Sequence, residues 1–252
     1  MAKGQVVDET GLQLNPGSAY RMGARIFYYR ELAAEKPIPF HERVIYQDEN
    51  ILVADKPHFL PVIPSGRFLH ETLLVRLRKQ GKLNEIVPIH RLDRETAGVV
   101  LFSLNPKTRG LYSSLFQDRK VRKVYEALAP ALSNVQGLRF PMTRRSRIVR
   151  GDPFFRMKEA AGEPNSETYI EVRENRDSVN LYELIPITGK KHQLRVHLSV
   201  LGIPIINDAL YPLRSVPAED DFSRPLKLLA KSISFQDPLS GQERYFESGG
   251  KL

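Results

Sequence analysis

The sequence predicts an α/β protein of the α+β kind, with a single domain around a mixed, largely antiparallel sheet and with flanking helices and loops. Short apolar runs alternate with helical patterns from residue 44 onward. The crossovers between strands are too few and too irregular for a doubly wound parallel sheet. No internal repeat with a period of roughly 20 to 50 residues is present. We therefore expect residues 41–252 to form one domain.

The first 40 residues are expected to form an arm rather than a domain. Asn-Pro-Gly at residues 15–17 is a turn signal, and Lys-Pro-Ile-Pro at residues 36–39 favours extended backbone. We therefore predict a loop-like segment over residues 1–40.

Four strands and two helices are expected in the first half of the domain. Apolar runs that end at Pro, Gly or polar residues predict the strands. Leucines on one helical face predict the first helix, and an Asn-Pro start predicts the second. In order, the elements are strands at residues 44–47 and 51–55, a helix at 71–80, a strand at 97–103, a helix from Asn105 and Pro106 to near Asp118, and a strand at 121–128.

The second half is expected to contribute a strand pair and a helix. Residues 168–172 and 179–185 are predicted as antiparallel partners joined by a polar turn. Residues 188–201 are predicted as a helix, because leucines recur there at helical spacing and Gly202 and Pro204 follow.

The chain is basic, with 38 Lys and Arg against 29 Asp and Glu in 252 residues, for a net charge of +9. Such a surplus favours a polyanionic partner, although many basic proteins bind no nucleic acid. The charge is clustered, most densely over residues 139–158. That stretch is open to two interpretations, a mobile loop that clamps RNA or a solvated basic surface.

The composition excludes several classes of function. The chain has no Cys and no Trp, which removes zinc knuckles, thiolate nucleophiles and iron–sulfur ligation and is compatible with a reducing cytosol. Apolar stretches such as residues 97–102 are far too short to span a bilayer. The first residues lack the pattern of a secretory signal. We therefore expect a cytoplasmic protein that is not inserted in a membrane.

Three polar segments are the candidates for chemistry: residues 90–98, 123–127 and 188–197. Asp93 stands out in the first, because it precedes the buried strand predicted at residues 97–103. A carboxylate in that position can be held rigidly and still open to a cleft.

These segments resemble, in order, the motifs of the RluA-type family of RNA pseudouridine synthases. The resemblance begins with the His-Arg-Leu-Asp signature at residues 90–93 and covers residues 43–247. Its motifs are residues 51–57, 90–93, Lys-x-Tyr-x-Ala at 123–127, His-Gln-Leu-Arg-Val-His at 192–197, residues 202–208 before Tyr211, and residues 228–230 before Phe235.

The resemblance implies the pseudouridine synthase fold and the isomerisation of uridine in RNA to pseudouridine, with no cofactor and no metal. Asp93 would act at the sugar, either by attacking C1′ or by removing the C2′ proton. Arg195 would pair with Asp93 through charge-assisted hydrogen bonds and keep it ionised. Tyr125 would stack against the uracil ring and relay the proton that leaves C5.

A monomer that acts on structured RNA, ribosomal or transfer, and not on DNA is the expected form of the protein. The target base must be flipped out of the RNA, and Arg91 is the candidate to support the flipped strand. Lys190, Lys191 and His192 at the start of a predicted helix would meet phosphate, or they are a solvated helix start. The full set of expected substrate-binding residues is His90, Arg91, Lys123, Lys190, Lys191, His192, Gln193 and Leu228.

The chain departs from the family pattern at several positions. Ala97 replaces the usual Ser, Asn207 replaces Gly, and Leu229 stands where many members carry His. Lys-Lys-His at residues 190–192 replaces the commoner Gly-Arg-Thr-His run, which affects the expected phosphate contacts. The 40-residue arm is too short and too irregular for a separate S4-like RNA-binding module, so substrate choice is expected to rest on the catalytic domain.

Three other functions compete with this interpretation. A glycosidase would need two carboxylates, and Asp93 and Glu95 on one strand face would lie about 6.6 Å apart, near the spacing of inverting enzymes. A non-catalytic RNA-binding protein would account for the charge alone. A metal-dependent hydrolase is disfavoured, because His192 and His197 are five residues apart and fall on different helical faces.

Overall fold

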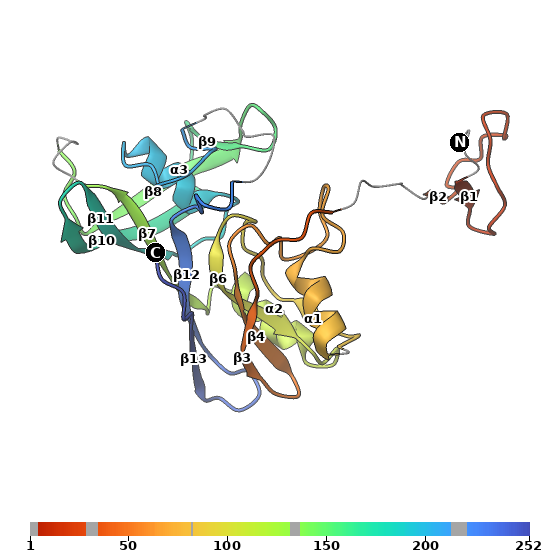
Figure 1. The fold of residues 1–252 in the computed structure, drawn as a ribbon, viewed down its shortest axis with the longest axis horizontal. Coiled ribbons are helices and arrows are strands. Elements are labelled where there is room, and N and C mark those ends of the chain that lie inside the picture. The colour runs from red at the N-terminus through yellow and green to blue at the C-terminus, as the bar shows by residue number, and fades with distance from the viewer. Residues whose placement is uncertain (1–4, 29–34, 82, 132–136, 213–220) are drawn as a thin grey trace. The chain divides into compact units, whose positions relative to one another are not determined.

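The computed structural model of the chain describes residues 5–28, 35–81, 83–131, 137–212 and 221–252 (Figure 1). The chain divides into two compact units, and the division falls between Lys36 and Pro37. The residues just after the division already belong to the core of the second unit, where Ile38 is buried.

The first unit contains a short antiparallel pair, β1 (Val6–Asp8) and β2 (Ile26–Tyr28). The sequence predicted only loop here, because strands of three residues are too short to show periodicity. The buried carboxylate of Asp8 accepts hydrogen bonds from the backbone N–H groups of Thr10 and Leu12 and so closes the turn that follows β1.

The second unit contains the mixed, largely antiparallel sheet that the sequence predicts. Among the described residues its strand order is β3-β4-β6-β12-β7-β11-β10-β8-β9, with β13 beside β12 and β5 beside β6. The pairing of β6 with β12 is parallel, and the other pairings described in this sheet are antiparallel. The strands are β3 (Arg43–Gln47), β4 (Ile51–Lys56), β5 (Val87–Pro88), β6 (Ala97–Ser103), β7 (Arg122–Pro130), β8 (Met142–Arg150), β9 (Met157–Ala160), β10 (Ser166–Arg176), β11 (Val179–Pro186), β12 (Leu228–Gln236) and β13 (Glu243–Glu247).

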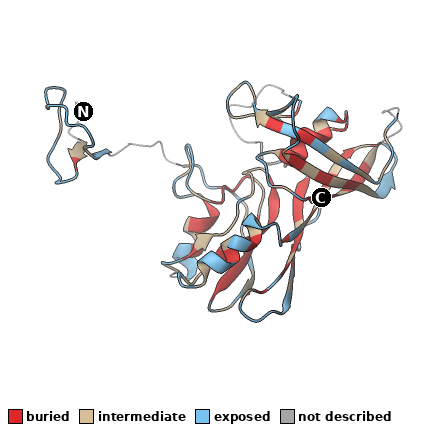
Figure 2. Cartoon of the chain, turned by 180° about the vertical axis from the view of Figure 1, so that it is seen from behind, coloured by how far each residue is buried: buried red, intermediate tan, exposed pale blue. Residues whose placement is uncertain are grey.

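Helices cover both faces of the half of the sheet around β4 and β6 (Figures 1 and 2). Leu52 and Ala54 of β4 pack in the cluster that contains the leucines of α1 (Leu73–Gly81). The alternate β4 residues Ile51 and Val53 pack in the cluster that contains Tyr112 and Leu115 of α2 (Arg109–Gln117). Since both faces are buried, β4 is a continuous apolar run rather than an alternating one.

A third helix, α3 (Gln193–Val200), packs against the other half of the sheet. Leu194 and Leu198 on this helix, with Leu201 just after it, belong to the cluster that contains Ala127 of β7 and Ile170 of β10. The predicted leucine spacing is therefore confirmed as the packing face of this helix. No helix in the described ranges is both long and apolar enough to cross a membrane.

The predicted strands at residues 44–47, 51–55, 97–103, 121–128, 168–172 and 179–185 are all present, within a few residues at their ends. The start predicted for α2 at Asn105 is wrong, because the Asn105 side chain accepts the N–H of Lys107 in a separate turn and Thr108 precedes the helix instead. The start predicted for α3 at Thr188 is also wrong. His192 has a left-handed backbone with φ of 56°, which separates the preceding turn from the helix.

The basic stretch at residues 139–158 is not the loop that one interpretation expected. Residues 142–150 form β8 and pair with β9 and β10. Strand β8 was not predicted because the polar Ser146 occupies an inward-facing position, while arginines occupy the exposed positions 145, 147 and 150. Strands β5, β9, β12 and β13 were not predicted either.

Three central strands bring two of the polar segments, residues 90–98 and 123–127, into one row. Ala230 of β12 is the register partner of Gly98 in β6 on one side and of Tyr125 in β7 on the other. Two strand spacings, about 10 Å, therefore separate the backbones at Gly98 and Tyr125. Asp93 lies in the loop that leads into β6, so this row places it near Tyr125.

We predict that Gly98→Ala destabilises the protein strongly. Gly98 has φ of +114°, and a Cβ atom there would lie 2.2 Å from the carbonyl oxygen of Ala230. The clash and the disfavoured backbone together should lower the free energy of unfolding by about 3 kcal/mol or more, measured by urea denaturation.

The matched control is Gly110→Ala. Gly110 lies in α2, and a Cβ atom there would have no described neighbour within 4 Å outside its own helix backbone. The same substitution should there stabilise the protein by about 0.5–1 kcal/mol. Equal effects of the two substitutions would contradict the described approach of β6 and β12.

Candidate active site

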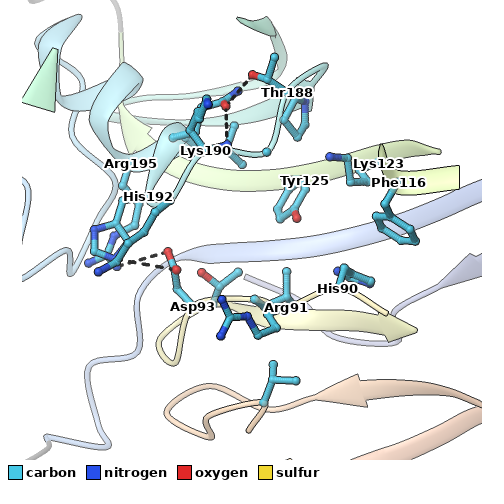
Figure 3. Close-up of a pocket in the computed structure, with 18 of the residues that line it drawn as sticks. His90, Arg91, Asp93, Phe116, Lys123, Tyr125, Thr188, Lys190, His192 and Arg195 are labelled. Carbon is cyan, nitrogen blue, oxygen red and sulfur yellow. Dashed lines mark hydrogen bonds and ion pairs between the residues drawn. The ribbon is translucent and has the colours of Figure 1, made fainter. Parts of the chain in front are cut away.

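The three polar segments meet at one pocket of about 970 Å³ (Figure 3). Its walls come from the loop before β6, from β7, from the segment that leads into α3, and from the first residue of β12. Every residue that the sequence predicts for catalysis or substrate binding lines this pocket: His90, Arg91, Asp93, Lys123, Tyr125, Lys190, Lys191, His192, Gln193, Arg195 and Leu228.

Asp93 lies in a tight turn whose backbone carbonyls contact polar groups of neighbouring residues. The N–H of Thr96 donates to the carbonyl of Asp93 over 3.1 Å. The buried ammonium group of Lys56 donates to the carbonyl of Arg94 over 3.0 Å, and His58 Nδ1 lies 2.7 Å from the carbonyl of Glu95. The Asp93 side chain itself is 28% exposed. The turn thus fixes the carboxylate and leaves it open to the pocket, as the sequence predicts.

Arg195 is the buried cation of the site, with a side chain only 2% exposed. Its Nε and Nη2 donate to the two oxygens of Asp208 over 2.8 and 2.7 Å. Burial opposes the charged form, but the hydrogen bonds and the charge of Asp208 raise the pKa of Arg195 overall, with help from Asp93 and Glu95. Arg195 is therefore charged, and its principal partner is Asp208.

The predicted hydrogen bond between Arg195 and Asp93 is wrong in its geometry. The Nη1 atom of Arg195 lies 3.8 Å from Asp93 Oδ2 and 3.7 Å from Glu95 Oε2, which are ion-pair distances and not hydrogen bonds. This buried nitrogen has no hydrogen-bond partner among the residues that the structure describes. Arg195 therefore presents one uncommitted N–H donor group between two carboxylates. Asp93 and Glu95 precede β6 instead of sharing a strand face, so the geometry considered for a glycosidase is not present.

His192 lies beside Arg195, faces the other oxygen of Asp93 and contacts Tyr211 (Figure 3). Its Nδ1 is 2.7 Å from the Tyr211 hydroxyl, and its Nε2 is 3.8 Å from Asp93 Oδ1. The same hydroxyl accepts the N–H of Met157 over 2.7 Å, so Tyr211 joins His192 to the start of β9. Burial lowers the pKa of His192 and outweighs the opposing charge of Asp93.

Tyr125 and Lys123 project from β7 into the pocket on the same strand face, as the alternation of the strand predicts (Figure 3). Burial raises the pKa of Tyr125, and the negative charge of Asp93 adds to the effect. The phenol is therefore protonated at neutral pH. Burial lowers the pKa of Lys123.

His90 has a structural contact in addition to its place in the pocket wall. Its ring stacks on Phe116 with centroids 4.7 Å apart, and its Nε2 accepts the N–H of Leu101 over 3.1 Å. Burial, with a smaller contribution from Lys123, lowers the pKa of His90 to about 3. The imidazole is thus neutral and ties the residues before Asp93 to β6.

The side chain of Gln193 is fully engaged within the protein. Its amide nitrogen donates to Glu167 and Thr168, and its amide oxygen accepts from Thr188 and from the N–H of Lys190. Gln193 therefore holds the segment that forms the pocket rim. Lys190 and Lys191 on that rim are exposed, as is Arg91 on the facing loop, and Leu228 is buried in the wall.

The comparisons with known proteins agree with this geometry. Residues 50–200 match the family described as RNA pseudouridylate synthase. The chain belongs to this family. The dual-specificity RNA pseudouridine synthase RluA of Vibrio vulnificus is 32% identical over 210 residues, which cover 78% of each chain. The predicted RluA-type family is thereby confirmed, and it is a family of isomerases.

One further relative and one solved structure show how much of this chain is similar to known pseudouridine synthases. The pseudouridylate synthase RPUSD2 of Homo sapiens is 33% identical over 181 residues, which are 67% of this chain and 30% of the longer relative. The solved structure of human RNA pseudouridylate synthase domain containing 4 is 27% identical with a TM-score of 0.62, and the match covers 81% of this chain and 87% of that one. These matches confirm the predicted fold.

Several residues of this pseudouridine synthase site were given no role by sequence reasoning. Asp208 and Tyr211 were noted only as motif positions, and no pattern in the sequence showed that they contact Arg195 and His192. Lys56 and His58 contact backbone carbonyls of the Asp93 turn, and Glu95 lies beside Arg195. No linear pattern in the sequence reveals these contacts. No group of three or more His, Asp or Glu in the described residues is arranged to hold a metal ion.

We predict that Asp208→Asn destabilises the protein by about 3–5 kcal/mol, because it leaves the buried Arg195 charge without its bidentate partner. Asp208 has a fully buried side chain. Glu95→Gln is the control, since Glu95 is 29% exposed and lies 3.7 Å from Arg195. Its cost should be below about 1 kcal/mol. Urea denaturation of both variants measures the difference, and an Asp208→Asn cost below that of the control would contradict the assigned pairing.

The neutral state of His90 predicts a pH dependence of stability. Its pKa of about 3 in the folded protein lies below the value of about 6.5 in an unfolded chain. The stability that the neutral ring contributes is therefore complete above about pH 6.5 and is lost as the pH falls toward 3.

The test measures the free energy of unfolding between pH 7 and pH 4 for the parent, His90→Gln and, as a control, His41→Gln at an exposed histidine. The first variant should lose less stability on acidification than the parent, and the control should follow the parent. A His90 ring that titrates near pH 6.5 by NMR would refute the assignment.

Proposed function

We propose that this protein isomerises a specific uridine in structured RNA, ribosomal or transfer, to pseudouridine. The observation that carries the proposal is the position of Asp93. Its carboxylate opens into a pocket large enough for a nucleoside, faces the buried cation of Arg195, and shares the pocket with the phenol of Tyr125. No cofactor enters the proposed reaction.

Asp93 is proposed to act on the ribose of the flipped nucleotide. The reaction breaks the bond from N1 to C1′ and joins C5 to C1′, and it needs an ionised carboxylate at the sugar. Arg195 places its charge 3.8 Å from Asp93 Oδ2 without a hydrogen bond to it, so it is proposed to orient the carboxylate while leaving its oxygens available to substrate. His192, whose Nε2 lies 3.8 Å from Asp93 Oδ1, is proposed to orient the same carboxylate at its other oxygen.

Tyr125 is proposed to hold the uracil ring and to relay the proton that leaves C5. Its oxygen accepts that proton as its own hydroxyl proton passes to solvent, and the freed ring nitrogen N1 takes up a proton. Because the phenol is protonated at neutral pH, it offers a donor and an aromatic face in the same position. A detached base must stay enclosed until it has turned, and Leu228 and Tyr125 supply the apolar wall that retains it.

The rim of the pocket is proposed to contact the RNA backbone. Lys190 and Lys191 stand on one side and Arg91 on the other, all exposed. These three cations suit phosphates on either side of the flipped nucleotide. Arg91 directly precedes the Asp93 turn and is proposed to support the RNA from which the uridine has left.

Asp93→Asn should abolish isomerisation and leave RNA affinity within a few-fold of the parent. The substitution removes the charge that acts on the sugar and keeps the shape of the pocket. The measurement is tritium release from 5-tritiated uridine in RNA taken from cells that lack the protein. Asp177→Asn, in the turn between β10 and β11, is the control and should keep the parent rate. Parent-level tritium release by Asp93→Asn would exclude Asp93 as the catalytic residue.

A further inference from the structure

Strands β8 and β9 form a hairpin whose turn spans residues 151–156. Arg150 and Met157 are register partners at the end of the two strands. Within the turn, the N–H of Gly151 donates to the carbonyl of Arg156 over 3.0 Å, and the N–H of Arg156 donates to the carbonyl of Pro153 over 2.9 Å. The turn is therefore an ordered element with its own hydrogen bonds.

The tip of this turn exposes an aromatic ring. Phe154 is 76% exposed, and its ring meets Phe155 edge-on with centroids 5.6 Å apart. Phe155 is half-buried beneath it. Phe154 thus makes little contribution to the core and presents a free ring face to solvent, which is the geometry that stacks on a planar ligand.

The strands on either side of this ring carry positive charge. Arg145, Arg147 and Arg150 are exposed along β8, and Lys158 is exposed on β9. The carboxylates of Glu159 and Glu167 pair with Arg144 and Arg145. Asp152 is the acidic residue of the turn itself. In and next to the turn, Arg150, Arg156 and Lys158 outnumber Asp152, so the surroundings of Phe154 carry net positive charge, which favours a polyanion over an apolar protein surface.

The turn is bonded directly to the wall of the active-site pocket. Lys191, which lines the pocket, donates from Nζ to the carbonyl of Phe155 over 3.1 Å. The guanidinium of Arg156 lies 4.9 Å from the ring centroid of Tyr211. The N–H of Met157 donates to the Tyr211 hydroxyl, which in turn contacts His192 beside Asp93. These contacts fix the base of the turn against the Lys191 rim.

We propose that the turn at residues 151–156 binds unpaired RNA next to the target uridine, with the ring of Phe154 stacked on an exposed base and Arg150 and Lys158 on the adjacent phosphates. The inference rests on the proposed function, because flipping one nucleotide out of RNA leaves its neighbours unstacked. An aromatic ring among cations is the combination that binds single-stranded nucleic acid without reading its sequence. Phe154 is then a substrate-positioning residue outside the pocket.

The test compares Phe154→Leu, which removes the ring, with Phe154→Trp, which keeps an aromatic face. Tyr245→Leu is the matched control, since Tyr245 is also an exposed aromatic residue, 58% exposed on β13. The probes are a fluorescent 12-nucleotide oligouridylate and a 12-base-pair RNA duplex, and fluorescence anisotropy measures both dissociation constants.

Loss of one base stack should weaken oligouridylate binding by about ten-fold in Phe154→Leu. Phe154→Trp and Tyr245→Leu should bind like the parent. Duplex binding should change by less than two-fold in all three variants, because paired bases offer no free face to Phe154. Oligouridylate binding by Phe154→Leu at the parent level, or an equal loss with the duplex, would overturn the proposal.

An activity measurement separates this inference from the proposed function. On RNA from cells that lack the protein, Phe154→Leu should raise KM several-fold and leave kcat near the parent value, while Asp93→Asn should abolish kcat. A parent protein that releases no tritium would refute the proposed function, and the binding comparison would still decide the role of Phe154. Unchanged KM and kcat in Phe154→Leu with an active parent would refute the stacking role alone.

Discussion

The arrangement of the site depends on the buried charge of Arg195. A guanidinium with 2% exposure is tolerable only if it is neutralised, and Asp208 supplies two short hydrogen bonds for that purpose. Because Asp208 occupies Nε and Nη2, the third nitrogen is free to face Asp93 and Glu95. The pair therefore fixes a positive charge beside Asp93 without engaging the oxygens of that carboxylate, and the chemistry proposed for Asp93 requires those oxygens.

The sheet determines where the Asp93 turn and Tyr125 lie in the same site as Arg195. The parallel pairing of β6 with β12 brings Gly98 against Ala230, and the antiparallel pairing of β12 with β7 sets Tyr125 in the same row. A side chain at Gly98 would push β6 away from β12 and would move the Asp93 turn with it. Lys56 and His58 hold that turn from the opposite side. Stability and site geometry are thus maintained by the same contacts.

The proposed RNA-binding surface around the pocket would extend the site from one nucleotide to a stretch of RNA. The β8–β9 turn, the rim lysines and Arg91 belong to three separate segments of the chain, and Lys191 joins two of them through its bond to Phe155. Tyr211 contacts both this turn and His192, so the β8–β9 hairpin and the Asp93 environment share one hydroxyl group. Family membership accounts for the pocket, while Phe154 and its cationic surroundings concern the RNA contact proposed for this chain.

The sequence by itself determined the fold class, six of the strands and a set of polar residues that all line the pocket, because alternation, helical leucine spacing and ordered motifs are local patterns. Only the tertiary structure decided which of those residues contact one another. Arg195 forms its hydrogen bonds with Asp208 and none with Asp93. The side chain of Gln193 bonds to backbone and hydroxyl groups of the protein, and residues 142–150 of the basic stretch form a strand. A buried polar group bonds to whichever partner the folded chain places nearest, and that choice depends on distances between strands that no linear spacing records.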